Sequence, residues 1–557
     1  MIKAEIKKRL KKACHLLKAK GIIPEEIEID PHVEVPREKE FGDYSTNLAF
    51  YLSKALKKDP KTIAQILLEN LEVDDICTEK RVAGGGFLNF YLKASFLREC
   101  LFKIFIHGME PFFPALGREK RVLVEFVSSN PTGPLHIGHG RCAAFGDALA
   151  RVLEKVGFSV TREYYINDAG RQMETLGESV YLRIKELSSE EVDFPKDFYK
   201  GEYIKDIAKE ILHKGITLPK ERSEAVRFLA RYASDRIMEG IKEDLEKFGV
   251  FFDSFKKESE FYESGLVDKT IGLLQESGYV YEKDGAKWFK TSLFEQDEDR
   301  VLVKSDGEKT YFASDIAYHR QKFLRGYDLL INVWGADHHG YVPRIMAALS
   351  ALNLNKELLK IILIQFVTLL KDGKPVGMST REATFTSLRE LVDEVGKDAA
   401  RFIFLTRKND AHLEFDLDLA KKKSNENPVY YVQYAHARIE SILRNALEEG
   451  FEIDWLTKRS VDRKILDLLS LEDELELMKA SSRFFEVVED VAKHLEPHRI
   501  TYYLIELAQK FHGYYNATRI LTEAKEISQA RLVLVFVIKE IIKEGLGMLG
   551  VEAPLKM

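Results

Sequence analysis

The segment RVLVEFVSSNPTGPLHIGHGRCAAFGDALARVLEKVGFSVTREYYIN, residues 121–167, decides the fold. It begins with the apolar, β-branched run 121–127, which is typical of a buried strand. A turn rich in proline and glycine follows, and then a helix-forming stretch at 143–158 and a second strand-like run at 159–167. A strand, a helix and another strand in this order predict a parallel α/β sheet.

The rest of the central region repeats this alternation around a charged stretch. A helix rich in Glu and Leu follows the second strand, and residues from about 175 to 300 are mixed and charged, as in an insertion. Strand patterns return at 329–336 and 361–370, with a helical pattern between them at 341–353. We therefore predict a doubly wound, Rossmann-type domain over residues 111–420, with an insertion at roughly 175–300.

Two further regions flank this domain. Residues 1–110 combine three helical stretches with a short strand-like run, FLNFYL at 87–92, and predict a small α+β domain. The helical stretches lie at 1–18, 45–57 and 60–71. Residues 421–557 have helical apolar spacing almost throughout, as in PVYYVQYAHARIESILRNAL at 428–447, and predict an α-helical bundle.

Composition narrows the class of protein. The chain of 557 residues is too long for one hydrophobic core, and its net charge of −6 neither requires nor excludes a nucleic-acid partner. Its four cysteines form no C-x-x-C pair, so we expect neither a disulfide framework nor a Cys-rich zinc site, and a reducing cytoplasm fits. There is no apolar secretory segment and no run of about 18 apolar residues, so we expect no membrane span.

The turn PLHIGH, Pro134–His139, lies between the first strand and the first helix of the sheet, which is where an open parallel sheet binds its ligands. Gly133 and Gly138 allow the backbone to approach a ligand closely, and the start of the helix offers free N–H groups to an anion. His136 and His139 could donate to phosphate oxygens as charge builds up in a transition state. The turn therefore predicts a nucleotide-handling site.

Pro134–His139 resembles the HIGH signature of class I aminoacyl-tRNA synthetases, and the wider stretch VEFVSSNPTGPLHIGHGR at 124–141 resembles the arginyl-tRNA synthetases in particular. Further segments are similar to that family in the family's own order: EFGDYSTNLAFYLSKAL at 40–56, GGGFLNFYL at 84–92, YYINDAGRQM at 164–173, SDIAYHRQKF at 314–323, WGADHHGY at 334–341 and FHGYYNATRIL at 511–521. The resemblance runs nearly from end to end.

This resemblance implies an enzyme that attaches L-arginine to tRNA(Arg) through an arginyl-adenylate, with bound tRNA needed before activation. ATP is then a substrate, accompanied by Mg²⁺, and no tightly bound cofactor is expected. The resemblance also implies a cytoplasmic monomer, with a tRNA-elbow-binding domain at 1–110 and an anticodon-binding domain at 421–557. His136, Gly138 and His139 are the expected catalytic residues of the turn.

The second class I signature, normally a KMSKS-like loop, departs from the family pattern. The corresponding stretch is KDGKPVGMSTREATF at 371–385, in which both signature lysines are missing. The catalytic residues expected from it are Met378, Ser379 and Arg381. A basic residue just before the first strand is the expected substitute for the lysines, and Lys120 is the candidate, with Lys374 and Arg381 as alternatives.

Arginine presents a planar guanidinium that donates in a fork, so paired acceptors suit it. The resemblance places seven residues near the amino acid: Ser128, Ser129, Asn130, His139, Tyr311, Asp315 and Asp337. Glu125, on the first strand, is another acidic candidate. We expect Asp315 and Asp337 at or just past the ends of strands, where a ligand role is reasonable. A helix cap or a structural acceptor is the alternative for a lone buried aspartate.

Candidate RNA contacts lie in both flanking domains. Phe87 could stack on an unpaired base and Asn89 could bond a base edge, although a core position and a strand end would explain them as well. In the C-terminal bundle the expected contacts are Tyr434, Arg438 and Tyr515. Tyr430, Tyr431, Tyr514 and Arg519 are further candidates, while an aromatic stripe at helical spacing also occurs in helix cores.

Two other functions stay open on the sequence alone. The missing lysines would suit a non-catalytic RNA-binding or assembly protein that kept the fold, although the intact histidines of the turn speak against it. A class I enzyme for another cationic amino acid, such as lysine, is the second alternative. The sequence Asp337-His338-His339 is not expected to bind a metal, because adjacent histidines rarely share one ion and no other ligands frame them.

Overall fold

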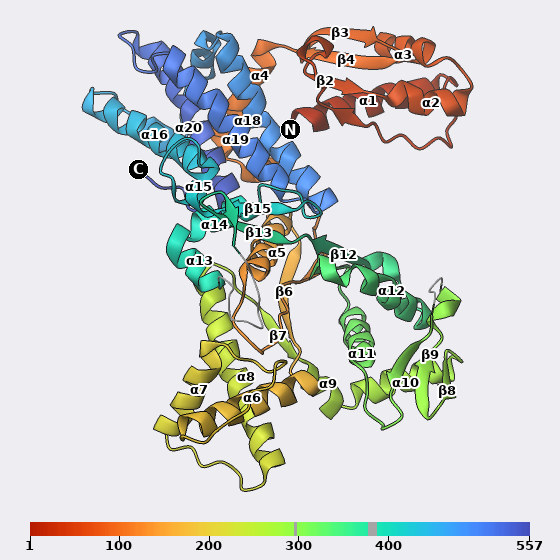
Figure 1. Ribbon diagram of the computed structural model, residues 1–557. Coiled ribbons are helices and arrows are strands. Elements are labelled where there is room, and N and C mark those ends of the chain that lie inside the picture. The colour runs from red at the N-terminus through yellow and green to blue at the C-terminus, as the bar shows by residue number, and fades with distance from the viewer. Residues whose placement is uncertain (295–297, 377–386) are drawn as a thin grey trace.

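The computed structural model describes residues 1–294, 298–376 and 387–557. A parallel sheet lies at the centre of the molecule, with the C-terminal helices on one side of it and two smaller lobes on the other (Figure 1). The N-terminal domain lies beside the upper part of the C-terminal helices (Figure 1). The predicted α/β class with a helical C-terminal region is confirmed.

The central sheet has five parallel strands in the order β12-β11-β5-β6-β7. They are β5 (Arg121–Glu125), β6 (Ser159–Ile166), β7 (Ser254–Lys257), β11 (Leu329–Gly335) and β12 (Leu359–Ile364). The chain builds outward from β5 to β6 and β7, and then returns to build β11 and β12 on the other side. The doubly wound fold is thus confirmed, and the order reverses beside the carboxyl end of β5, where such sheets bind ligands.

The segment predicted as an insertion contains a strand of this sheet. Helices α6 (Arg171–Leu187), α7 (Glu202–His213) and α8 (Arg222–Lys247) form a separate lobe, after which β7 pairs in parallel with β6. The strand was not predicted because its sequence, SFKK, is short and mostly polar. Beyond it come α9 (Glu258–Glu263), α10 (Leu266–Glu276) and a small antiparallel sheet of β8 (Val280–Lys283), β9 (Ala286–Phe289) and β10 (Arg300–Val303).

The strand predicted at 361–370 is two strands in different sheets. β12 ends at Ile364, and β13 (Val367–Lys371) pairs with β14 (Lys374–Pro375) and in parallel with β15 (Leu413–Asp416). Gln365 and Phe366 separate them, and Gln365 N–H donates to the carbonyl of Asn409 instead of continuing the ladder. The other helices of this region are α11 (Tyr311–Leu324), α12 (Val342–Ala351), α13 (Leu388–Val395), α14 (Lys397–Phe404) and α15 (Leu417–Lys421).

The N-terminal domain has the three helices expected from the apolar spacing, α1 (Ile2–Ala19), α2 (Leu48–Leu56) and α3 (Pro60–Glu69). They pack on a four-stranded sheet in the order β1-β2-β4-β3: β1 (Val33–Glu34), β2 (Tyr44–Thr46), β3 (Cys77–Ala83) and β4 (Phe87–Leu92). A fourth helix, α4 (Ala94–His107), was not predicted and contacts the C-terminal bundle.

The C-terminal bundle consists of α16 (Pro428–Glu448), α18 (Glu472–His494), α19 (His498–Ala517) and α20 (Lys525–Met548), with the short α17 (Asp454–Thr457) between the first two. It is joined to the N-terminal domain by Glu486 of α18, which accepts hydrogen bonds from the Tyr44 hydroxyl at 3.0 Å and from the Lys3 N–H at 2.8 Å. Within the described ranges, no helix is long and apolar enough to cross a membrane. All four cysteines are buried and unpaired.

Candidate active site

The turn at Pro134–His139 closes on itself through its two histidines. His136 caps α5 (Ile137–Lys155), and its Nδ1 accepts from the N–H groups of Gly138 at 3.1 Å and His139 at 3.4 Å. In return, the Nδ1 of His139 accepts from the N–H of His136 at 3.2 Å. The two rings stack with their centroids 3.7 Å apart. A capping box made of histidines therefore fixes both rings at the start of the helix.

These hydrogen bonds set the protonation of both rings. An Nδ1 that accepts a hydrogen bond has no proton, so the neutral ring carries its proton on Nε2. Burial lowers the pKa of His136, and burial together with the neighbouring His136 lowers the pKa of His139 well below its usual value. Both rings are thus neutral at pH 7 and present an Nε2–H donor. The turn also excludes a side chain at Gly138, whose Cβ would lie 2.9 Å from Cε1 of His136.

The backbone that leaves β5 brings two of the expected arginine contacts together. Val127 and Ser128 have φ values of 67° and 41°, a left-handed conformation that is costly for these residues and is often retained at functional sites. The Ser128 hydroxyl donates to Oε1 of Glu125 at 3.0 Å. Ser129 instead bonds the hydroxyl of Tyr164, at 3.1 Å from its N–H, and Asn130 is exposed.

Asp315 does not lie at the end of a strand, as the sequence pattern predicted, but in the second turn of α11. It is 4% exposed, and its Oδ1 lies 3.0 Å from Nδ1 of His319 one turn along the helix. Among the residues that the structure describes, its Oδ2 has no hydrogen-bond partner. Asp337 does follow a strand, β11, but it is exposed, and His338 at 3.3 Å holds the pKa of Asp337 below its usual range. Asp337 also acts electrostatically on both histidines of the turn.

Three residues at this site were missed from the sequence: Tyr165, Glu258 and Tyr341. Glu258 is the first residue of α9, directly after β7, and its Oε1 accepts from the Ser314 hydroxyl. Its Oε2 and the hydroxyls of Tyr165 and Tyr341 are buried and, within the described part of the chain, have no hydrogen-bond partner. Burial, with the charge of Asp315 as a smaller cause, raises the pKa of Glu258 to about 7. Tyr165 and Tyr341 lie in segments that resemble the family. Nothing in the sequence indicated Glu258, because β7, the strand before it, was not predicted.

Glu125, Glu258 and Asp315, here called the carboxylate cluster, come from three segments that the sheet brings to one edge. Electrostatic coupling with all three carboxylates acts on Tyr165. Tyr311, the first residue of α11, is 44% exposed, and its ring centroid lies 6.0 Å from that of Tyr341. Buried acceptors without donors are uncommon in folded proteins and call for an explanation, of which a missing cationic ligand is one.

Of the basic candidates, the structure describes Lys120 and Lys374. Lys120 is exposed and precedes β5, so it lies at the amino end of a strand whose carboxyl end leads to the turn. Five residues at about 3.3 Å each put roughly 17 Å between the two ends. Replacement of the signature lysines by Lys120 therefore stays a prediction, and the position of Lys120 at this end of β5 does not favour it. Lys374 is exposed on β14, and Met378, Ser379 and Arg381 lie outside the described residues.

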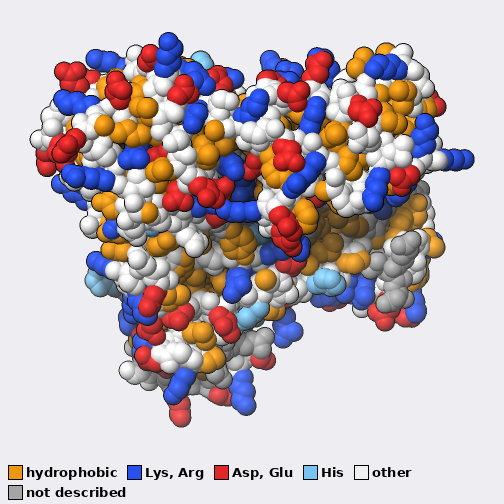
Figure 2. Space-filling view, turned by 90° about the horizontal axis from the view of Figure 1, so that it is seen from above, with side chains coloured by type: hydrophobic (Ala, Val, Ile, Leu, Met, Phe, Trp, Pro, Cys, Tyr) orange, Lys and Arg blue, Asp and Glu red, His pale blue; other side chains and the backbone are white. Residues whose placement is uncertain are grey.

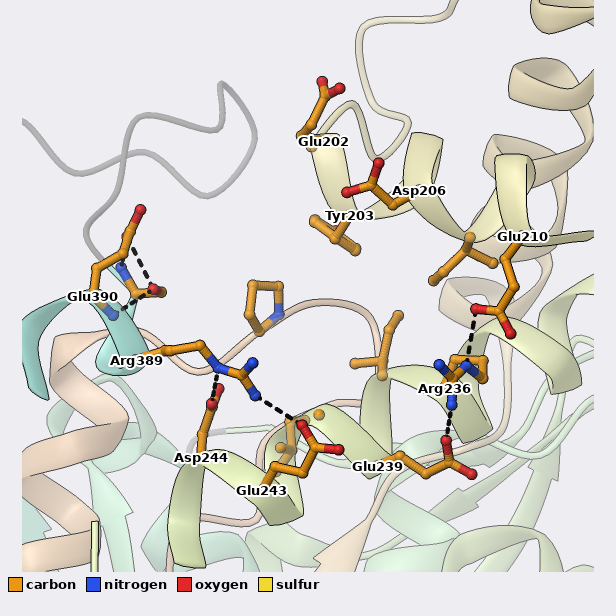
Figure 3. A pocket seen from close by; sticks show the side chains of 17 residues that line it. Glu202, Tyr203, Asp206, Glu210, Arg236, Glu239, Glu243, Asp244, Arg389 and Glu390 are labelled. Carbon is orange, nitrogen blue, oxygen red and sulfur yellow. Dashed lines mark hydrogen bonds and ion pairs between the residues drawn. The ribbon is translucent and has the colours of Figure 1, made fainter. Parts of the chain in front are cut away.

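A cavity of about 580 Å³, which Pro134 of the turn helps to line, opens between α7, α8 and α13 (Figure 3). Its rim carries seven acidic side chains and two arginines: Glu202, Asp206, Glu210, Glu239, Glu243, Asp244, Glu390, Arg236 and Arg389. The arginines are already paired, Arg389 with Asp244 and Glu243, and Arg236 with Glu210 and Glu239. Such an acidic lining repels a triphosphate, so this cavity is not the nucleotide site. Within the described ranges, no three His, Cys, Asp or Glu side chains are placed to hold a metal ion.

The candidate RNA contacts differ in how available they are. Phe87 is 37% exposed and packs against Phe50 at 4.9 Å between centroids. Asn89 is only 2% exposed, and its Oδ1 accepts from the Ser45 hydroxyl at 2.8 Å, which agrees with the alternative of a structural residue. The surface seen from above carries Lys and Arg intermixed with Asp and Glu, so charge alone does not mark an RNA face (Figure 2).

The aromatic candidates of the C-terminal bundle divide into two groups. Arg438 lies between the rings of Tyr434 and Tyr515, 4.4 and 4.7 Å from their centroids, beside a hollow of about 420 Å³ that Arg444 and Lys556 also line. Tyr514, in contrast, is 1% exposed. Its hydroxyl donates to Oε1 of Glu474 at 3.1 Å, as expected for a core residue.

Three family models match the chain. The model described as tRNA synthetases class I (R), catalytic domain, matches residues 103–440, which is more than half of the chain. The model of the arginyl tRNA synthetase N terminal domain matches residues 1–92, and that of the DALR anticodon binding domain matches residues 432–557.

Relatives of known function match over nearly the full length. The arginine--tRNA ligase of Syntrophotalea carbinolica is 51% identical, over 96% of this chain and 96% of that protein. The arginine--tRNA ligase of Aquifex aeolicus is 46% identical, over 94% and 96%. Among solved structures, the Thermus thermophilus arginyl-tRNA synthetase superposes with a TM-score of 0.77 at 25% identity, covering 100% of both chains. The likeness therefore includes both flanking domains.

Proposed function

Because the chain belongs to the arginyl-tRNA synthetase family, and hence attaches L-arginine to tRNA through an arginyl-adenylate formed with ATP, we propose which side chains carry out each part of that reaction. One observation supports the assignment above all. A turn with two neutral imidazole donors lies at the same edge of one parallel sheet as the carboxylate cluster, in which Asp315 and Glu258 each have one oxygen without a partner among the described residues. The first suits the phosphates of ATP, and the second suits a cationic amino acid.

The ATP phosphates bind at the start of α5. The positive dipole end of the helix attracts them, and the Nε2–H groups of His136 and His139 donate to the oxygens around the α-phosphorus. As the arginine carboxylate attacks, charge on those oxygens grows, and donors already held in place stabilise it without rearranging. Glycine is needed at position 138 because a Cβ there would meet the ring of His136 and displace this donor.

Arginine lies across the carboxylate cluster. Its carboxylate has to reach the α-phosphate, so its α-amino end lies nearest the turn, with Glu125 and Ser128 at the end of β5. Its guanidinium then lies toward Asp315 and Glu258, whose oxygens without a partner in the described part of the chain can accept from the planar donor fork. Tyr311 and Tyr341 flank it, Asp337 is assigned to the junction with the turn, and Ser129 and Asn130 shape the backbone that leads to the turn.

The remaining basic residue of the second signature, Arg381, is our candidate for the pyrophosphate side of the reaction, with Met378 and Ser379 in the same segment. Mg²⁺ belongs to the nucleotide substrate, because it commonly binds through phosphate oxygens and water and not through an all-protein cage. We assign no step of the chemistry to a protein-bound metal.

The flanking domains bind tRNA. Residues 1–110 bind the elbow, where Phe87 offers a partly exposed ring, and residues 421–557 bind the anticodon, where Arg438 stacked between Tyr434 and Tyr515 offers a flat surface of the kind that holds unpaired bases. Activation of arginine requires the bound tRNA, and the enzyme works as a monomer in the cytoplasm.

Pyrophosphate exchange tests these assignments together. Exchange that depends on arginine, ATP and tRNA supports them, whereas full exchange without tRNA contradicts the tRNA requirement. Exchange driven equally by lysine contradicts the arginine assignment of the carboxylate cluster. Light scattering of the free enzyme tests the monomer, and a mass of about two chains would refute it.

A further inference from the structure

Three buried side chains of α11 lie on one face of the helix. Asp315, His319 and Lys322 are spaced by four and three residues, which aligns them along the helix. They are 4%, 1% and 0% exposed. A lysine with no exposed surface is unusual, because a buried ammonium has lost its hydration and requires a partner.

Hydrogen bonds join this face to the carboxylate cluster in one continuous chain. The Nζ of Lys322 donates to Oε2 of Glu125 and, at 2.8 Å, to Oδ1 of Asn332 on β11. The Nδ2 of Asn332 lies 2.8 Å from Nε2 of His319 and donates to it. The Nδ1–H of His319 then donates to the carbonyl oxygen of Asp315 at 2.8 Å, with Oδ1 of the same residue at 3.0 Å.

Every donor in the chain is determined by its neighbour. Lysine can only donate, so Asn332 presents its oxygen to Lys322 and its NH₂ to His319. His319 therefore accepts on Nε2 and donates on Nδ1. The two ends of the chain, Glu125 and Asp315, are the carboxylates at the two ends of the proposed arginine site, and the three residues between them are at most 1% exposed.

A second ion pair, formed by the C-cap residue of the same helix, shows what a purely structural arrangement looks like. The carboxylate of Glu163 on β6 accepts two hydrogen bonds from the guanidinium of Arg325, at 2.6 and 2.7 Å. It also accepts from the hydroxyls of Tyr318 and Ser254. Both of its oxygens are thus satisfied within the protein. The chain from Lys322 ends instead on Asp315, whose Oδ2 has no partner within residues 1–294, 298–376 and 387–557.

We propose that Lys322, Asn332 and His319 are positioning residues for arginine selection, which hold Glu125 and Asp315 at a fixed separation and orientation. Lys322 neutralises one carboxylate of the cluster, and His319 turns the other so that one of its oxygens stays available. The inference rests on the proposed contacts of Glu125 and Asp315 with arginine.

The test compares Lys322→Met with Arg325→Met, which removes the cation that pairs with Glu163 at the C-terminal end of α11. We expect Lys322→Met to raise the arginine KM at least 10-fold, to change kcat less than 3-fold, and to leave the ATP KM within 2-fold of its original value. Arg325→Met should lower the thermal stability and leave the arginine KM within 2-fold. Equal changes in both variants, or a parallel rise in both KM values, would refute the positioning role.

Asn332→Ala provides a second test in case Lys322→Met does not fold. It cuts the chain in the middle and leaves the Lys322–Glu125 pair in place, and we expect a 3- to 10-fold rise in the arginine KM with the ATP KM unchanged. An unchanged arginine KM would overturn the inference. Asp315→Asn separates this failure from that of the proposed function: if it raises the arginine KM while the chain variants do not, only the positioning role is lost.

Discussion

The turn at Pro134–His139 and the carboxylate cluster meet at one edge of the sheet, yet they satisfy their polar atoms in opposite ways. In the turn, the N–H groups of His136, Gly138 and His139 all find acceptors within four residues of sequence. In the cluster, Asp315 and Glu258 come from segments 57 residues apart, and each keeps a buried oxygen without a partner in the described structure. The turn is therefore complete before any ligand arrives, whereas the cluster is completed by a cation. Rate should depend on the first region, and selectivity on the second.

The largest expected effect separates capping from donation in the turn. His136→Asn keeps a good helix cap but removes the Nε2–H donor, so kcat should fall about 10²–10³-fold, the cost of losing one such donor. Single-turnover activation with tRNA present measures it. His136→Ala is the control: it should lose the same activity and, in addition, about 1 kcal/mol of stability in denaturant unfolding. An active His136→Asn enzyme would show that the ring acts only as a cap.

The next effect lies in the cluster. Asp315→Asn keeps the shape and removes the charge, and a hydrogen bond to a charged group contributes about 1.5–3 kcal/mol, so the arginine KM should rise roughly 10- to 150-fold. The ATP KM should stay within 2-fold. Exchange assays at varied arginine measure both. If the ATP KM rose by the same factor, the division between the two regions would be wrong.

A smaller effect is a pH dependence carried by Glu258. Its pKa of about 7 means that the carboxyl is mostly protonated at pH 6 and mostly ionised at pH 8. Only the ionised form attracts a guanidinium, so the arginine KM should fall about tenfold between these pH values. Glu258→Gln should abolish that fall. The same protonation adds stability that is present near pH 4.5 and is lost as the pH rises through 7, and a flat unfolding free energy over that interval would contradict the assignment.

The smallest effect is expected at Lys120. Its position at the amino end of β5 predicts that Lys120→Ala leaves activation within 2-fold, and stability within 0.5 kcal/mol, because it is an exposed residue away from special contacts. A large loss of activation without a loss of stability would mean that this end of the strand takes part in the chemistry. The rate would then not depend on the turn alone.

What could be predicted from the sequence follows the same division. The strand, turn and helix around His136 are encoded within 40 consecutive residues, so their apolar spacing and their turn residues are sufficient. The sequence pattern placed Asp315 at the end of a strand, whereas the structure places it in α11. This helix packs against α9 and α12, and such contacts between distant segments cannot be seen in the local sequence TYFASDIAY. Glu258 depends on the pairing of β7 with β6 across 91 residues, which a local pattern does not contain. For Lys120, the sequence shows only that the residue adjoins a strand, and the structure adds that it lies at the amino end of β5.

The hydrogen bond between Tyr44 and Glu486 limits how the N-terminal domain can be removed from the protein. Glu486 is buried, and burial raises its pKa, so this carboxylate depends on donors from the first 44 residues of the chain. Removing the N-terminal domain would leave Glu486 in the C-terminal bundle without the donors from Lys3 and Tyr44. The domain is thus not a detachable accessory: a shortened enzyme would need Glu486 replaced by an apolar residue before it could serve as a minimal catalyst.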